Sequence, residues 1–385
     1  MIDCNCASFY FLRERMEKVF ERKTKEDRPV LAICYDFDKT LSPDDMQAQG
    51  YIQSVGYEVE SFWTESNGLA ESNDMDQNLA YMYTMIQKAR GRFIFNRKTL
   101  MDYGAKVSLF PGVDTWFKRI REYGETKGVI VEHYIISSGL KEMIEGTKVA
   151  NEFEKIYASS FYYDENGEAK WPAQVINYTS KTQFLFRIVK GTLDVNDSGV
   201  NDYFNPEDIR IPFRNMVYIG DSDTDIPCMK LVNSHFGHSI GVYNPETRDR
   251  RKVYKMMEDK RIKYFAPADY TDSSELDKLV KAIIDQTASN EKLMSVHFQC
   301  KQEQVDHNMN IDSHEDREKQ KLILDLENSN SFKQTHSVIS KLKQIKKWTR
   351  GEKNQLQEIA KTNNQVSYII DDDDVADFYK SISAD

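Results

Sequence analysis

The stretch VLAICYDFDKT, residues 30–40, joins six consecutive apolar residues to two closely spaced aspartates, Asp36 and Asp38. A short apolar run without interruption, directly after Pro29, predicts a strand that is buried on both faces. In an extended chain, side chains two residues apart lie on the same side. The two carboxylates would therefore repel each other unless a cation or a proton lay between them. The stretch predicts a buried strand that ends in an acidic site.

Two further apolar runs have the same character. Residues 129–136 are followed by Ser137, and residues 216–219 are followed by Gly220 and Asp221. Helical patterns alternate with these runs, which predicts an α/β domain with a mostly parallel sheet. Because ligands bind at the carboxyl ends of parallel strands, we expect the polar residues after the strands to meet at one edge. Also predicted are strands at 239–243 and 263–266, a hairpin turn at 164–167, and helices with apolar stripes at Val113, Trp116, Phe117 and Ile120 and at Leu79, Met82, Tyr83 and Ile86.

The paired carboxylates allow three interpretations. Asp36 and Asp38 could cap a helix or a solvated turn, bind Mg²⁺, or act as a nucleophile with a neighbouring acid or base. Asp221 and Asp225 are four residues apart, so a helical turn after the strand would bring them to the same side. Together the four carboxylates indicate an oxygen-rich site of the kind that Mg²⁺ prefers.

Donors for an anion are predicted near the same edge. Lys181 lies at the start of a predicted helix, and Ser137 lies at the end of a predicted strand. Both positions suit an anionic ligand. The role of Asp223, within the same loop as Asp221, stays open between support of the metal and no role.

The order and placement of these residues resemble the haloacid dehalogenase superfamily of phosphohydrolases. The first family motif, DxDx(T/V), is matched by residues 36–40, and the second, a Ser or Thr that closes an apolar strand, by Ser137. Lys181 matches the third motif, a lysine at a helix start, and residues 220–225 match the fourth, GDxxxD. The resemblance covers about residues 29–284.

The resemblance implies a role for each motif residue. Asp36 would attack phosphorus and form an aspartyl-phosphate, while Asp38 would protonate the leaving oxygen and then activate water. Ser137 and Lys181 would bind the phosphoryl group and neutralise its charge. Mg²⁺ is the implied cofactor, held by the Asp36 carboxylate, the Asp38 backbone carbonyl and Asp221, with Asp225 supporting the metal or its waters.

The resemblance also predicts the domain organisation. A catalytic core of residues 29–42 and 108–288 would carry a helical cap of residues 43–107, similar to that of the phosphoserine-phosphatase-like branch. Such a cap excludes water and contacts the leaving group, which suits a small phosphorylated substrate. Basic side chains of the cap segment could reach the substrate or lie on a solvated face. They are Arg90, Arg92, Arg97 and Lys98.

Both ends of the chain lie outside this predicted core. Residues 1–28 predict an amphipathic N-terminal helix, because apolar residues recur on one side. Residues 289–385 predict a polar linker followed by a helical region, with a capping box at Thr349 and Glu352. We expect this C-terminal region to self-associate or to bind a protein partner.

Composition narrows the function. The 385 residues are 40% hydrophobic and carry a formal net charge of −10, which argues against a general nucleic-acid binder. Five cysteines without a disulfide-like framework fit a reducing cytoplasm. No apolar run approaches the roughly 20 residues that span a bilayer, so no membrane partner is expected.

The expected fold is α/β: a Rossmann-like parallel sheet, a helical cap inserted after the first strand, and a C-terminal helical extension. The expected function is a Mg²⁺-dependent phosphomonoester hydrolase that acts through an aspartyl-phosphate on a small phosphorylated metabolite or nucleotide. Dehalogenases of this superfamily lack the second aspartate, so Asp38 favours a phosphatase. Two alternatives stay open: a phosphotransferase with the same intermediate, and a partner-binding module with a phosphate-sensing domain.

Overall fold

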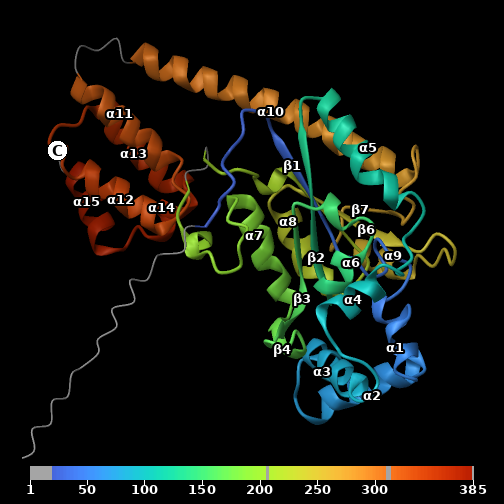
Figure 1. Cartoon of the computed structure of the whole chain (residues 1–385). Coiled ribbons are helices and arrows are strands. Elements are labelled where there is room, and N and C mark those ends of the chain that lie inside the picture. The colour runs from blue at the N-terminus through green and yellow to red at the C-terminus, as the bar shows by residue number, and fades with distance from the viewer. Residues whose placement is uncertain (1–19, 205–207, 309–313, 384–385) are drawn as a thin grey trace, which may run out of the picture.

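The computed structural model describes residues 20–204, 208–308 and 314–383. Its centre is a seven-stranded sheet in the order β4-β3-β2-β1-β5-β6-β7 (Figure 1). All neighbouring strands pair in parallel except β3 and β4, which form an antiparallel hairpin around the predicted turn. The predicted α/β class is confirmed. The strands are β1 (Val30–Tyr35), β2 (Ile130–Leu140), β3 (Lys155–Tyr163), β4 (Ala169–Gln174), β5 (Met216–Gly220), β6 (His238–Tyr243) and β7 (Tyr264–Pro267).

The central strand β1 has the bounds that its sequence predicts, and all of its residues are buried. Its alternate side chains enter two apolar clusters, one on each face of the sheet: Leu31 and Ile33 in one, Ala32 and Cys34 in the other. Strand β2 is longer than expected, because it continues past Ile136 to Leu140 after a shift in its register with β3. Backbone pairing therefore extends the strand over polar residues, which a prediction from apolar runs leaves out.

Helices cover both faces of the sheet. Helix α5 (Val113–Thr126) packs on one face through the predicted stripe, together with the start of α10 (Glu275–Asn308). The other face is covered by α7 (Thr182–Lys190), α8 (Ile226–Ser234) and α9 (Arg251–Glu258). The short helix α6 (Lys141–Gly146) follows β2.

The segment after β1 is helical and lies beyond the carboxyl ends of the strands (Figure 1). Its buried residues, such as Phe62 and Met82, belong to the same apolar cluster as Leu31. The stripe predicted for α3 is wrong at Tyr83, which is 49% exposed. The face that packs is rotated to Tyr81, Met82, Met85 and Ala89. The helices are α1 (Tyr51–Ser54), α2 (Val59–Ser72), α3 (Gln77–Ala89) and α4 (Arg97–Gly104).

The N-terminal helix predicted for residues 1–28 is not found where the chain is described, since residues 20–28 form no helix, and residues 1–19 lie outside the described part. Ion pairs with the core hold this segment in an irregular path. Lys23 Nζ lies 2.6 Å from Glu132 Oε1, and the Lys23 backbone amide donates to Gly191 O. Arg22 pairs with Asp197 at 2.6 Å. The charged side chains of residues 20–28 thus bind the core instead of forming a solvated helix face.

The linker predicted after residue 288 is wrong at its start, because α10 continues to Asn308. Long, straight side chains such as Glu291, Lys292 and Gln302 favour the helix despite their polarity. Helix α10 runs from the sheet towards a group of five helices with an apolar core of their own (Figure 1). The predicted capping box at Thr349 and Glu352 is confirmed. The five are α11 (His314–Glu327), α12 (Phe332–Leu342), α13 (Arg350–Thr362), α14 (Asn364–Tyr368) and α15 (Asp373–Ser383). No helix in the described ranges has the length and apolar character of a membrane span.

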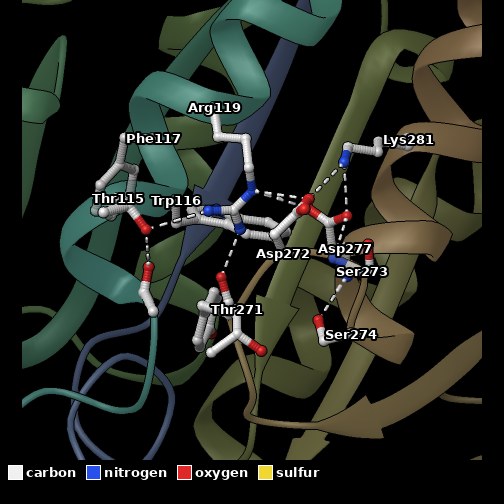
Figure 2. Close-up of polar contacts among 12 residues, drawn as sticks. Thr115, Trp116, Phe117, Arg119, Thr271, Asp272, Ser273, Ser274, Asp277 and Lys281 are labelled. Carbon is white, nitrogen blue, oxygen red and sulfur yellow. Dashed lines mark hydrogen bonds and ion pairs between the residues drawn. The ribbon is translucent and has the colours of Figure 1, made fainter.

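A buried carboxylate joins α10 to α5 (Figure 2). Asp277, 1% exposed, lies 3.2 Å from Arg119 Nε and 2.7 Å from Lys281 Nζ, and it accepts the Ser273 backbone N–H at 3.1 Å. Arg119 also donates to Tyr270 O at 2.6 Å. These contacts fix the start of α10 and the preceding loop against the sheet domain.

We expect Asp277→Ala to lower the free energy of unfolding by about 2–3 kcal/mol, because two cations and a backbone N–H lose their shared acceptor. Urea unfolding measures this value. Asp285→Ala is the matched control, because Asp285 lies on the same helix as Asp277 and pairs with Lys127. The Asp285 side chain is 46% exposed, so its loss should cost less than about 1 kcal/mol. Equal losses in the two variants would contradict the role given to burial.

A buried histidine is held neutral in the core. Trp116 Nε1 donates to Tyr35 Oη at 2.8 Å, which leaves the Tyr35 hydrogen for His133 Nδ1 at 3.0 Å. His133 Nε2 therefore carries the hydrogen and donates to Phe117 O at 3.3 Å. Burial lowers the pKa of His133 to about 3.

Stability should therefore fall as the pH is lowered from about 6.5 to about 3, because the unfolded chain binds the His133 proton in that window and the folded chain does not. The expected slope is about 1.4 kcal/mol per pH unit for this group. Unfolding free energies at pH 7.5 and 5.0 would be compared between the wild type and His133→Leu. The variant should be less stable at pH 7.5 but lose this part of the slope. An unchanged slope would show that His133 does not titrate on unfolding.

Candidate active site

The first part of the site is the turn that follows β1. The Asp36 backbone amide donates to Ile219 O at 2.9 Å, so Asp36 extends the pairing of β1 with β5. The chain then turns, with Lys39 in the left-handed region at φ 58°. The Asp38 carboxylate accepts the Met46 backbone N–H at 2.9 Å. Burial, followed by the charges of Asp45 and Asp36, raises the pKa of Asp38 well above its ordinary range.

Lys181 connects two of the predicted carboxylates beneath this turn. Its ammonium lies 2.7 Å from Asp225 Oδ1 and 3.3 Å from Asp36 Oδ1, and the side chain is fully buried. Burial alone would lower the pKa of Lys181, but the carboxylates of Asp225 and Asp36 outweigh it and raise the pKa. The residue is therefore a permanent positive charge beneath Asp36.

Asp225 is held at the start of α8 by several donors. Tyr218 Oη donates to its Oδ1 at 2.9 Å, and the amide and hydroxyl of Ser222 donate to its Oδ2, each at 3.0 Å. A Cβ at Gly220 would lie 2.5 Å from Asp225 Oδ2, so only glycine fits at the end of β5. The structure thus explains the first and last residues of the GDxxxD pattern: Gly220 leaves room for Asp225, and the Asp225 carboxylate accepts several hydrogen bonds.

Three carboxylates form a compact acidic group. Oxygen atoms of Asp36, Asp221 and Asp225 lie within 4.8 Å of one another. Burial and then the Asp225 charge raise the pKa of Asp36 to about 6 and that of Asp221 to about 7. Asp36 Oδ1 is buried and makes the 3.3 Å ion pair with Lys181 but no hydrogen bond within the described chain. Crowded carboxylate oxygens of this kind fit a hard divalent cation such as Mg²⁺.

The end of β2 supplies hydroxyl groups to the same place. Ser137 and Ser138 line a cavity together with Asp36, and the buried Ser138 Oγ has no partner among the described residues. A Cβ at Gly139 would lie 2.9 Å from Asp38 Oδ2, so this glycine lets β2 approach the aspartate turn.

The cavity has a volume of about 270 Å³ and brings together most of the predicted residues. Asp36, Asp38, Ser137 and Asp221 line it. Lys181 and Asp225 do not line the cavity. Lys181 contacts Asp36, and Asp225 lies close to Asp36 and Asp221. Asp223 is exposed and does not line the cavity.

Of the two alternatives for the basic cap residues, the structure favours the solvated face, because all four are exposed and none lines this cavity. Arg97 is instead paired with Glu145, and the Arg92 guanidinium lies against Gly56. Helical spacing alone could not tell which face of the cap segment turns towards the sheet. The cap residues at the cavity wall come from α2 and α3: Trp63, Asn67, Gln77, Asn78 and Tyr81.

Several residues of the site were not predicted from the sequence. Tyr218 lies inside an apolar run, where its hydroxyl gives no signal of a contact with Asp225. Tyr270 is distant in sequence and donates to Thr40 O at 2.8 Å, which supports the aspartate turn. Lys252 lies 3.7 Å from Asp221 Oδ2 and belongs to a basic stretch whose members look alike in sequence.

A comparison with family models identifies the family of this chain. The family model of haloacid dehalogenase-like hydrolases matches residues 33–230. An uncharacterized protein of Borreliella burgdorferi is 26% identical over 279 residues, in an alignment that covers 65% of this chain and 95% of that protein. A HAD family hydrolase from Salmonella enterica serovar Typhi is 17% identical, with a TM-score of 0.44 over 67% of this chain and 73% of that one. A probable phosphoserine phosphatase from Vibrio cholerae is 10% identical, with a TM-score of 0.44 over 69% of this chain and 67% of that one.

Proposed function

Because the chain belongs to the haloacid dehalogenase-like hydrolases, we propose that it is a Mg²⁺-dependent phosphomonoester hydrolase with an aspartyl-phosphate intermediate. The observation that carries this proposal is the pair of carboxylates, Asp36 and Asp38, at one cavity, with the buried ammonium of Lys181 beneath the first. One carboxylate can attack while the other moves a proton. Hydrolysis of a carbon–halogen bond would need no proton donor for the leaving halide, so Asp38 favours a phosphate ester.

In the first half-reaction, an oxygen of Asp36 attacks phosphorus and the bond from phosphorus to the leaving oxygen breaks. Asp38 donates its proton to that oxygen, so the product leaves as a neutral alcohol. The raised pKa of Asp38 keeps the proton available for this step. In the second half-reaction, Asp38 takes a proton from water, the water oxygen attacks phosphorus, and the Asp36 carboxylate is released with inorganic phosphate.

The remaining residues of the site hold the phosphoryl group and its charge. Ser137 is placed to donate its hydroxyl to a phosphoryl oxygen, and Lys181 supplies positive charge beneath Asp36. Mg²⁺ would be held by carboxylate oxygens and would neutralise charge on the phosphoryl oxygens when bound. The proposed ligands are the carboxylates of Asp36, Asp221 and Asp225 and the backbone carbonyl of Asp38.

The proposal is tested by phosphate release from p-nitrophenyl phosphate and a panel of natural phosphomonoesters, with Mg²⁺ or with EDTA. We expect turnover with Mg²⁺ and its loss in EDTA, restored when Mg²⁺ is added in excess. Release in water without an acceptor alcohol would count against a strict phosphotransferase. A folded, Mg²⁺-supplied protein that releases phosphate from no ester would overturn the proposal.

A further inference from the structure

The wall of the cavity away from the catalytic carboxylates carries no charge. It is formed by residues of α2 and α3 and by Gln47 from the turn after β1. This wall and the two aspartates line one cavity, so the leaving group of an ester bound at Asp36 would lie against it. The uncharged wall consists of Gln47, Trp63, Asn67, Gln77, Asn78 and Tyr81.

The two cations of the cavity lining already have partners of opposite sign. Lys39 Nζ lies 2.7 Å from Asp45 Oδ2, and Lys252 Nζ lies 3.7 Å from Asp221 Oδ2. Both lysines belong to the side that carries the carboxylates. A leaving group with its own carboxylate would thus meet no unpaired cation among the described lining residues. Asn67 and Gln77 are exposed, so the cavity is partly open, and a charge that enters it loses part of its hydration without gaining a partner.

The uncharged wall offers donors and acceptors of hydrogen bonds. The side-chain amides of Asn67 and Gln77 make no hydrogen bond to another described residue, and each combines donor and acceptor atoms. Trp63 adds a flat apolar ring whose Nε1 has no partner within the described chain. Hydroxyl groups both donate and accept, and the C–H face of a sugar or polyol can pack on an indole ring.

The size of the cavity points the same way. A volume of about 270 Å³ is near the lower end of ligand pockets, and it must also hold the phosphoryl group. A leaving group of sugar or polyol size fits this space better than a nucleoside, which adds a base to the sugar.

We infer that the substrate is the phosphate ester of a small uncharged hydroxylated molecule, a sugar or polyol, whose hydroxyl groups bind Asn67 and Gln77 beside Trp63. The inference rests on the proposed phosphatase function and names its substrate class.

The test compares kcat/KM for two groups of phosphate esters. Glucose 6-phosphate and glycerol 3-phosphate have an uncharged leaving group, whereas phosphoserine and phosphoethanolamine have a charged one. Adenosine monophosphate has a larger uncharged leaving group, and p-nitrophenyl phosphate is the reference. We expect at least one sugar or polyol ester to exceed each charged ester and the nucleotide by about tenfold or more. A preference for phosphoserine, phosphoethanolamine or the nucleotide would overturn the inference while turnover of the reference ester upheld the phosphatase. No turnover of any ester would overturn both.

Variants of the wall locate the effect. Asn67→Ala and Gln77→Ala should each raise KM and lower kcat/KM for the best sugar or polyol ester by about three- to tenfold, since each removes a hydrogen bond to the substrate. They should leave p-nitrophenyl phosphate within about twofold, because that ester lacks the hydroxyls. Gln87→Ala, on the outer side of α3, is the matched control and should change neither ester. Equal losses for both esters in Asn67→Ala and Gln77→Ala would overturn the assigned contacts.

Discussion

Asp36→Asn should lower phosphate release by a factor on the order of 10³ to 10⁴, with the fold intact. An amide oxygen is a poor nucleophile and cannot form the aspartyl-phosphate. Asparagine has the shape of aspartate and removes one of three crowded carboxylates. Stability should therefore not fall, because burial of the charge and then repulsion from Asp225 raise the pKa of Asp36, and the variant relieves both. Steady-state phosphate release and thermal unfolding measure the two effects.

The matched control for this variant is Asp102→Asn, which makes the same chemical change on the exposed surface of α4, outside the cavity. It should retain wild-type turnover. Residual activity of Asp36→Asn within about tenfold of the wild type would show that another group attacks phosphorus. Loss of the folded transition would instead show that Asp36 is required for the fold.

The strands and the catalytic edge could be predicted because both depend on local sequence. Continuous apolar runs gave the positions of β1 and β5, and the polar residues that follow them had to lie at one edge of a parallel sheet. The extension of β2 through Ser137 could not be predicted, because backbone pairing with β3 is independent of apolar side chains.

Contacts between residues far apart in the chain could not be predicted from the sequence. The pairing of Lys181 with Asp225 joins residues 44 positions apart, and its geometry depends on how α7 and α8 pack on β5. The orientation of the cap segment was equally hidden. Its polar residues occur on several faces, so the neutral wall at Asn67 and Gln77 follows only from the rotation of α2 and α3.

The ends of the chain show a further limit of local reasoning. Residues 20–28 have charges that suit a helix face, yet ions of the core such as Glu132 and Asp197 hold them in an irregular path. The sequence predicts a linker in the second half of α10 because large apolar residues are few there, although its long side chains favour a helix. Polarity predicted exposure correctly there but not the backbone conformation.

Asp38→Asn should affect the two half-reactions to different extents, depending on the ester. The asparagine oxygen can still accept the Met46 N–H, so the aspartate turn should keep its shape. For an alkyl ester, the leaving alkoxide needs a proton, and kcat should fall by about 10² to 10⁴. For p-nitrophenyl phosphate, the leaving anion is stable without a proton, so attack by Asp36 should proceed at a rate much closer to that of the wild type.

The second step then becomes slow for both esters, because no group at position 38 takes a proton from water. We expect a burst of p-nitrophenolate close to one equivalent per active site, followed by slow turnover. A phosphoryl adduct should be visible by mass spectrometry of the intact variant. The double variant Asp36→Asn with Asp38→Asn is the control and should give neither burst nor adduct. Equal losses for alkyl and p-nitrophenyl esters without a burst would remove the proton-transfer role from Asp38. In the proposed mechanism Asp38 serves as acid and then as base, so one substitution should slow proton transfer to the leaving oxygen and proton transfer from the water that replaces it.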